Sequence, residues 1–106
     1  MIGDKDKQFW GHVAPMLAAG RADPDTIMGS GCIRVGGEFL AMPNHKGGGL
    51  VVKLPRDRVS ELISHGDGEP FAPAGKVFRE WVLVRVYSPE LWDQLLEEGR
   101  TFVSRP

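Results

Sequence analysis

Three short runs of apolar and β-branched residues, separated by glycine-rich breaks, occupy the middle of the chain. They cover residues 32–35, 38–42 and 50–54. Gly36 and Gly37 separate the first two runs, and both can adopt the positive φ that a two-residue hairpin turn requires. The pattern therefore predicts an antiparallel meander, in which residues 44–49 form a mobile hairpin loop because they are too rich in glycine to be ordered by their own side chains.

Apolar residues at helical spacing predict three helices, over residues 4–19, 55–65 and 88–103. Inside the first, Pro15 predicts a kink near Gly11 or a break, because proline removes one backbone hydrogen bond and clashes with the preceding turn. Ser88 is a typical N-cap residue, and Pro89 suits the first position of a helix. The last helix therefore has a defined start.

Two more strands are expected, a short one at residues 26–28 and a strongly patterned one at residues 81–86. The connection over residues 66–75 is rich in proline and glycine and contains one aromatic residue, Phe71. We expect Phe71 to hold this long surface connection against the core.

The predicted order is helix, four strands, helix, strand, helix, within one domain that spans residues 1–106. Consecutive strands without intervening helices are typical of an antiparallel sheet. The sequence thus predicts a two-layer α+β fold, in which a mainly antiparallel sheet of about five strands has its helices packed largely on one face. Two layers leave the other face of the sheet open.

Strand parity predicts which side chains lie on that open face. If Val52 and Val84 point toward the helices, their neighbours in sequence point away. The predicted surface consists of Val51, Trp81 and Leu83, flanked by Arg34, Lys53 and Arg85. An exposed apolar patch is typical of an interaction surface, so we expect a protein partner or a second copy of the chain to bind here.

In that interpretation Trp81 contributes little to the core of the monomer. The alternative is that a terminal segment, the loop of residues 66–75 or the N-terminal helix covers this face.

The charge balance bears on nucleic-acid binding. Thirteen Lys and Arg residues face fourteen Asp and Glu residues, which gives a formal net charge of −1 and does not favour general binding to phosphates. One modest basic cluster keeps a DNA-binding accessory domain as an alternative: Lys46, Lys53, Arg56 and Arg58. Cations at a helix N-terminus are disfavoured by its dipole, so this cluster indicates either a site for an acidic group or a solvated face paired with Asp57 and Glu61.

The chain shows no constellation typical of a catalytic or metal site. Cys32 is its only cysteine and lies in an apolar run, and the three histidines, His12, His45 and His65, lack ligand spacing. The glycine runs lead into strands instead of helices, and no serine lies in G-x-S-x-G. We therefore expect no catalytic residue, metal or cofactor, and a non-catalytic binding or regulatory adaptor domain. The alternative is a small-ligand protein or enzyme whose pocket is assembled from scattered residues.

Location is predicted from what the chain lacks. No run approaches the roughly 20 apolar residues of a membrane span. The N-terminal residues Asp4, Lys5, Asp6 and Lys7 do not fit the apolar core of a signal peptide, so we expect a cytoplasmic protein without membrane contact.

Several short motifs follow one another in a familiar order between residues 23 and 103: Met28-Gly29, Arg34-Val35-Gly36-Gly37-Glu38-Phe39-Leu40-Ala41, Leu50-Val51-Val52-Lys53-Leu54-Pro55 and Glu69-Pro70-Phe71. In these motifs the chain resembles the TfoX N-terminal and MmcQ/YjbR-like family of small bacterial domains. The resemblance implies a two-layer α+β fold similar to that of type III secretion chaperones. It provides no catalytic residues, and the competence-regulating members act through an additional C-terminal domain that this chain is too short to carry.

Overall fold

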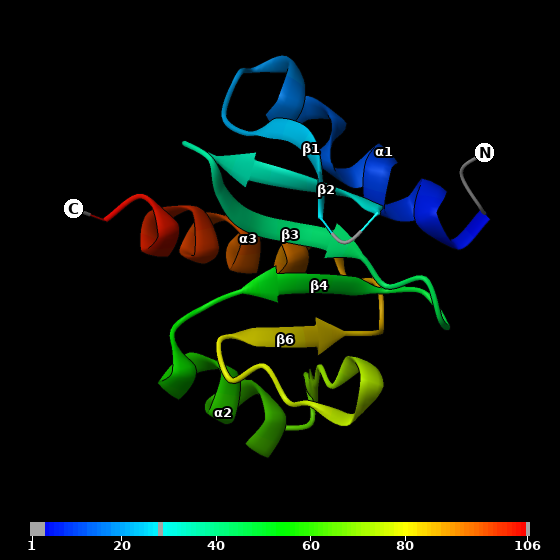
Figure 1. Cartoon of the computed structure of the whole chain (residues 1–106), viewed down its shortest axis with the longest axis vertical. Helices are drawn as coiled ribbons and strands as arrows, with labels where there is room; N and C mark the ends of the chain where they lie inside the picture. The colour runs from blue at the N-terminus through cyan, green and yellow to red at the C-terminus, as the bar shows by residue number, and fades with distance from the viewer. Residues whose placement is uncertain (1–3, 28, 106) are drawn as a thin grey trace.

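The sheet is antiparallel throughout. The computed structural model describes residues 4–27 and 29–105, and its strands lie in the order β1-β2-β3-β4-β6-β5 (Figure 1). The strands are β1 (Asp23–Ile27), β2 (Ser30–Val35), β3 (Glu38–Pro43), β4 (Leu50–Lys53), β5 (Glu69–Pro70) and β6 (Trp81–Val84). The antiparallel prediction is confirmed, and the two-residue strand β5 adds one strand to the number expected.

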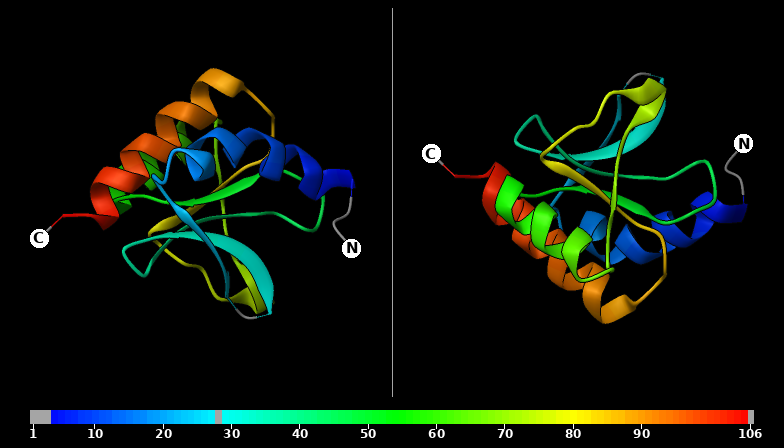
Figure 2. Two further views of the ribbon diagram at one scale, coloured as in Figure 1. Left: turned by 90° about the horizontal axis from the view of Figure 1, so that it is seen from above. Right: turned by 90° about the horizontal axis from the view of Figure 1, so that it is seen from below.

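Three helices pack on this sheet: α1 (Asp4–Ala18), α2 (Arg56–Ser64) and α3 (Pro89–Val103). Helix α3 lies across β3 and β4, α1 packs against β3, and α2 packs at the β5–β6 edge. Figure 2 shows α1 and α3 on one side of the sheet, with the β1–β2 edge turned away from them. The predicted α+β fold with helices largely on one face is therefore confirmed.

The Gly36–Gly37 turn forms as predicted. Both residues have positive φ, 57° and 86°, which matches the right-handed twist of the two flanking strands. The turn places Val35 opposite Glu38 and starts the β2–β3 pairing.

A bulge in β3 interrupts the alternation of side chains. Pairing changes from Arg34–Phe39 to Ile33–Ala41, so Leu40 is an extra residue in β3. As a result, Leu40 and Ala41 both belong to the core beneath the helices, whereas Phe39 packs on the opposite face. Sequence alternation alone does not predict this change of parity.

The core beneath the helices contains the residues expected from strand parity. Leu50, Val52 and Leu54 are fully buried, and Val82 and Val84 are buried beside them. They pack against the apolar faces of the helices, which supply chiefly Phe9, Val13, Val59, Leu62, Trp92, Leu95 and Leu96. Helical and strand periodicity together therefore predict this core.

Helix α1 continues through Pro15 to Ala18, so of the two alternatives, a kink or a break, the break is wrong. Buried Phe9 and Val13 precede the proline, and the partly buried Met16 and Leu17 follow it. Because these side chains pack on one core, tertiary contacts hold both parts of the helix in place despite the lost backbone hydrogen bond.

The loop of residues 44–49 is also ordered differently from the prediction. Asn44 is buried, and its side-chain amide donates to the carbonyl oxygens of Lys46 and Gly48 at 2.8 and 2.9 Å. Its backbone N–H donates to Gly49 at 3.0 Å. One side chain therefore organises the glycine-rich loop, contrary to the expectation of a mobile connection.

The element ends refine the remaining predictions. Strand β6 ends at Val84, two residues early, and Val86 is 78% exposed. Ser88 caps α3 as expected, because its hydroxyl accepts a hydrogen bond from the Leu91 N–H. The expected strand at residues 26–28 is part of β1, apart from Met28, which lies outside the described residues.

No helix in residues 4–27 and 29–105 is long and apolar enough to cross a membrane.

Gly99 sets how closely α3 approaches the sheet. A Cβ atom at this position would lie 2.7 Å from the Lys53 carbonyl oxygen and 2.8 Å from Leu40 Cδ1. We predict that Gly99→Ala lowers the free energy of unfolding by about 1–3 kcal/mol, because α3 must move away from β4. Thermal and urea denaturation measure the change.

Gly11→Ala is the matched control for that substitution, because Gly11 is also helical and a Cβ there meets nothing within 4 Å. It should leave stability unchanged or raise it by about 0.5–1 kcal/mol. Equal melting temperatures for Gly99→Ala and the wild type would show that α3 does not need this close contact.

Candidate functional site

Five of the six residues predicted for the open face share one face of the sheet, and the sixth, Arg85, lies just beyond the end of β6. Strand pairing places Val51 opposite Leu83 and Lys53 opposite Trp81. Arg34 lies opposite Phe39, and Phe39 packs with Val51 and Leu83 in a second hydrophobic cluster. Strand parity therefore predicted the face correctly.

The expected exposure of this face is wrong. Val51 is fully buried and Leu83 is 6% exposed, and they pack with the buried Cys32. Phe71, from the connection after β5, packs against this second cluster together with Trp81. The alternative in which the loop of residues 66–75 covers the face is the one observed.

Four aromatic rings, which we call the aromatic cluster, lie against this side of the sheet: Phe39, Phe71, Phe78 and Trp81. The Trp81 ring is the centre of the cluster and lies 4.1 Å from Phe39, 5.0 Å from Phe78 and 5.6 Å from Phe71, centroid to centroid. These three contacts are stacked, with interplanar angles between 14° and 24°. Phe39 is buried, and the other three rings are partly exposed.

Backbone hydrogen bonds hold the connecting segment in place beside the sheet. The Phe78 N–H donates to the Phe71 carbonyl at 3.0 Å, and the Trp81 N–H donates to the Phe78 carbonyl at 3.2 Å. Sequence analysis did not predict a role for Phe78, since residues 76–80 follow neither helical nor strand periodicity. The aromatic content of this segment was the only available signal.

The arginines at the rim of this face have carboxylate partners on the same molecule. Arg34 Nε lies 3.1 Å from Asp25 Oδ2. Arg85 donates two hydrogen bonds to the carboxylate of Glu69, at 2.8 and 3.1 Å. These bonds lower the pKa of Glu69 and raise that of Arg85. Both arginines are therefore engaged with carboxylates of neighbouring strands instead of standing free for a partner.

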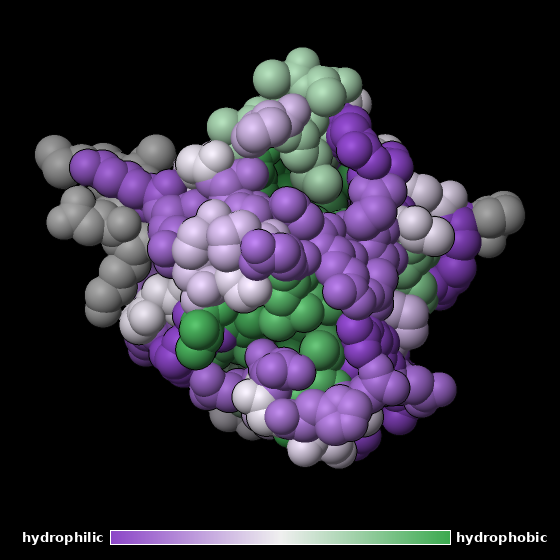
Figure 3. Space-filling model, turned by 180° about the vertical axis from the view of Figure 1, so that it is seen from behind, coloured by the Kyte–Doolittle hydropathy of each residue, from purple (hydrophilic) through white to green (hydrophobic). Residues whose placement is uncertain are grey.

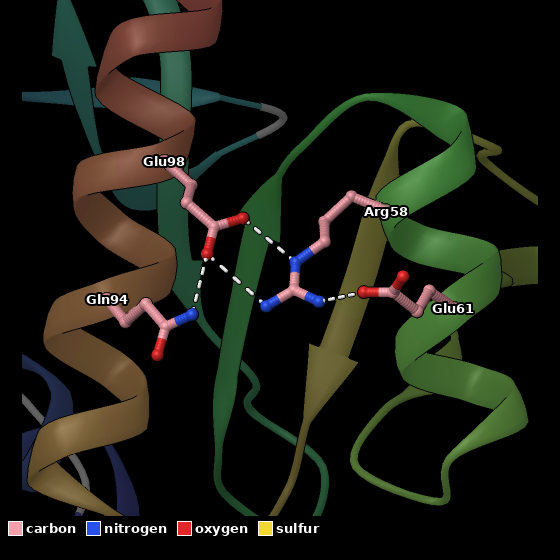
Figure 4. Close-up of polar contacts among 4 residues, drawn as sticks. All are labelled: Arg58, Glu61, Gln94 and Glu98. Atoms are coloured by element: carbon pink, nitrogen blue, oxygen red, sulfur yellow. Dashed lines mark hydrogen bonds and ion pairs between the residues drawn. The ribbon is translucent and has the colours of Figure 1, made fainter.

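The predicted basic cluster is divided in a similar way. Arg58 joins α2 to α3 by donating to both carboxylate oxygens of Glu98, at 2.9 and 3.3 Å, and it also pairs with Glu61 (Figure 4). Gln94 donates to Glu98 from the preceding turn of α3, at 3.0 Å. The hydrogen bond from Arg58 to Glu98 is the main reason that the pKa of Arg58 is raised. The guanidinium of Arg58 thus links α2 to α3.

Arg56 lies on another side of α2 and faces a notch. The notch has a volume of about 220 Å³ and separates α2 from residues 77–81. Ile63 and Phe78 form part of its apolar wall, and Arg56 and Arg79 supply its charged groups. It therefore continues the partly exposed edge of the aromatic cluster.

A histidine cluster joins α1 to α3 on the helix side of the molecule. The His12 side chain is only 7% exposed, and its Nδ1 lies 2.9 Å from the Tyr87 hydroxyl. Its ring packs edge-on against Tyr87 and Trp92, both at 5.5 Å between centroids. Asp93 Oδ1 lies 2.8 Å from Nε2.

The His12 cluster forms part of a wide groove of about 840 Å³ between α1 and α3. Two other polar residues in the groove, Arg21 and Glu97, form an ion pair with each other at 2.8 Å. Arg100 also hydrogen-bonds to Glu97, and this contact lowers the pKa of Glu97. The sequence did not predict this groove, because its residues come from the two ends of the chain.

The helix side also shows a strip of hydrophobic surface between more polar regions (Figure 3). Ile63 of α2 and Leu91 of α3 are partly exposed and pack against the core beneath the helices.

The remaining candidate chemistry is limited. Cys32 is buried, and burial raises the pKa of its thiol, which disfavours the reactive thiolate. Among the described residues no group of three or more His, Cys, Asp and Glu side chains could hold a metal ion.

No protein-family model, curated protein or solved structure matches this chain.

Trp81 contributes to the fold itself, contrary to the sequence-based expectation. We predict that Trp81→Ala lowers the free energy of unfolding by about 2–3 kcal/mol, below the roughly 3–5 kcal/mol typical of fully buried aromatic residues, because the ring is partly exposed. Trp81→Phe keeps a stacked ring and should lose less than half of that amount. Chemical denaturation of both variants measures the difference, and unchanged stability of Trp81→Ala would contradict a structural role.

Proposed function

We propose that this domain is a non-catalytic protein-binding domain, and that it recognises a partner protein through the aromatic cluster and the adjacent Val77. The observation that carries this proposal is the set of partly exposed rings, Phe71, Phe78 and Trp81, stacked against the sheet. Val77 is 54% exposed and continues the apolar surface beside them.

The composition of this surface favours protein recognition. Large aromatic residues and arginines contribute most of the binding energy in protein interfaces, because they bury much area and make directed contacts. Trp81 and Phe78 are held by stacking and backbone hydrogen bonds, so a partner would find them already positioned. Pre-positioned side chains lose little conformational entropy on binding.

The electrostatics support binding over catalysis. Each resolved pKa shift arises from an arginine–carboxylate pair or from the burial of Cys32. A catalytic acid or base would instead combine a shifted pKa with a position facing a substrate. In the His12 groove, the charged side chains of Arg21 and Glu97 form an ion pair with each other.

The basic residues give less support to DNA binding than to a protein partner. Arg58 is engaged with Glu98 and Glu61, so it does not add to a phosphate-binding surface. Most nucleic-acid binding is driven by the release of counterions from the phosphates that basic residues neutralise. A chain with a formal net charge of −1 would gain little affinity in this way.

Val77 provides the test of this surface. We predict that Val77→Asp lowers the recovery of specific partner proteins about tenfold in crosslinked pull-downs from the native host, because it puts a charge into the apolar contact. Val86→Asp is the matched control, since Val86 is also an exposed valine and lies outside the aromatic cluster. Quantitative mass spectrometry compares both variants with the wild type.

The proposal is wrong if Val77→Asp recovers the same proteins as the wild type, or if Val86→Asp loses them equally. Light scattering of the purified protein tests the other occupant considered. Self-association that Val77→Asp abolishes would assign the surface to a second copy of the chain and overturn the proposed partner.

A further inference from the structure

Two arginines at the notch beside the aromatic cluster differ from the others in this chain. Five arginines form ion pairs with carboxylates, namely Arg21, Arg34, Arg58, Arg85 and Arg100. Arg105 lies over the ring of Phe102, 3.9 Å from its centroid. Arg56 and Arg79 have no ion pair or side-chain hydrogen bond with any residue in the described part of the chain.

These two arginines line the same notch from opposite sides. Arg56 belongs to α2, and Arg79 follows Val77 and Phe78 in the segment that leads to β6. No acidic residue lines the notch, and most of its other lining residues are apolar. Two positive charges therefore flank an apolar recess without an internal counterion.

The positive charge of Arg56 does not stabilise α2. It is the first residue of α2, where the helix dipole disfavours a cation, and α2 has no side-chain N-cap. A helix that began with an acidic residue would be the more stable one. The position of Arg56 is therefore better explained by what its side chain meets in the notch.

The size of the notch limits what it can hold. Pockets for cofactors and drug-sized ligands typically measure roughly 300–1,000 Å³, whereas this one measures about 220 Å³. That space accommodates about one side chain. The charge of its rim favours a carboxylate, because guanidinium groups bind carboxylates through paired, charge-assisted hydrogen bonds.

We propose that the notch binds an apolar residue of a partner peptide together with a carboxylate next to it. This inference rests on the proposed function and specifies the partner segment that the aromatic cluster recognises. The apolar side chain packs against Val77, Phe78 and Ile63, and the carboxylate lies between Arg56 and Arg79. An acidic segment is chosen over a nucleic acid because the recess is too small for a stacked base with its sugar and phosphate.

Nuclear magnetic resonance titration of the full chain, labelled with ¹⁵N, tests the inference with three short probes. They are acetyl-Gly-Leu with a free carboxylate, the same dipeptide with a C-terminal amide, and acetyl-Leu-Glu-amide. The two probes that carry a carboxylate should shift the backbone amide signals of Arg56, Val77, Phe78 and Arg79 and the indole signal of Trp81. The probe without a carboxylate should bind about tenfold more weakly.

Variants identify the groups that provide the selectivity. Arg56→Gln and Arg79→Gln should each weaken the carboxylate probes about tenfold and leave the amide probe unchanged. Arg21→Gln is the matched control, because it removes the same charge from an arginine that is paired with Glu97 outside the notch. It should leave all three affinities unchanged.

The outcomes separate this inference from the proposed function. Equal binding of all three probes at the notch would overturn the preference for a carboxylate and leave the apolar binding surface standing. Shifts at these residues with a thymidine octanucleotide, but with none of the peptides, would overturn the inference in favour of nucleic acid. Absence of any shift with the peptides at millimolar concentration would also overturn it, whereas the Val77→Asp pull-down tests the proposed function independently.

Discussion

The central strands of the sheet must be buried on both faces, although all three helices pack on one of them. Val51 and Val52, neighbours on β4, point to opposite faces and are both fully buried. The helices cover Val52. The cover over Val51 comes from Phe71, in the connection between α2 and β6, together with Trp81 at the start of β6. An exposed apolar face would favour aggregation, so this connection is needed to bury the second face of the sheet.

That requirement explains the form of the second face. The connection has no regular secondary structure beyond β5 and one turn of 3₁₀ helix, and it is fixed mainly by stacked rings and a few backbone hydrogen bonds. Rings that reach over a sheet from a loop are buried on the side toward the sheet and exposed on the other. The same residues therefore stabilise the monomer and form the surface that we propose for a partner, so substitutions there are expected to affect both properties.

Ion pairs complete the structure at the places where elements meet. Arg58 connects α2 with α3, Arg85 connects the end of β6 with β5, and Arg21 connects the start of the first hairpin with α3. Exposed pairs of this kind each contribute little to stability, but they hold long side chains in defined positions. Against that background the two arginines of the notch are distinct, because they contribute to no such connection among the described residues.

Local sequence patterns determined those features whose physical cause lies within a few residues. Two adjacent glycines can adopt the positive φ of a tight hairpin, and Ser88 can cap the helix that follows it, whatever the rest of the chain does. Strand alternation likewise placed Trp81, Leu83 and Val51 on one face, because neighbouring side chains in a strand must point in opposite directions. The antiparallel α+β fold and most of the core under the helices follow from such patterns.

Tertiary structure alone decided what covers the second face, which arginines are paired, and how His12 meets Tyr87 across 75 residues of sequence. It also decided that α1 passes through Pro15 and that Asn44 orders its loop. Periodicity predicts the direction of a side chain relative to its own backbone. Its burial and its ion-pair partners depend instead on which distant segments occupy the space into which it points. For Trp81 the direction could be predicted from residues 81–84, but its burial depended on Phe71 and Phe78, whose segment has no period from which a position could be predicted.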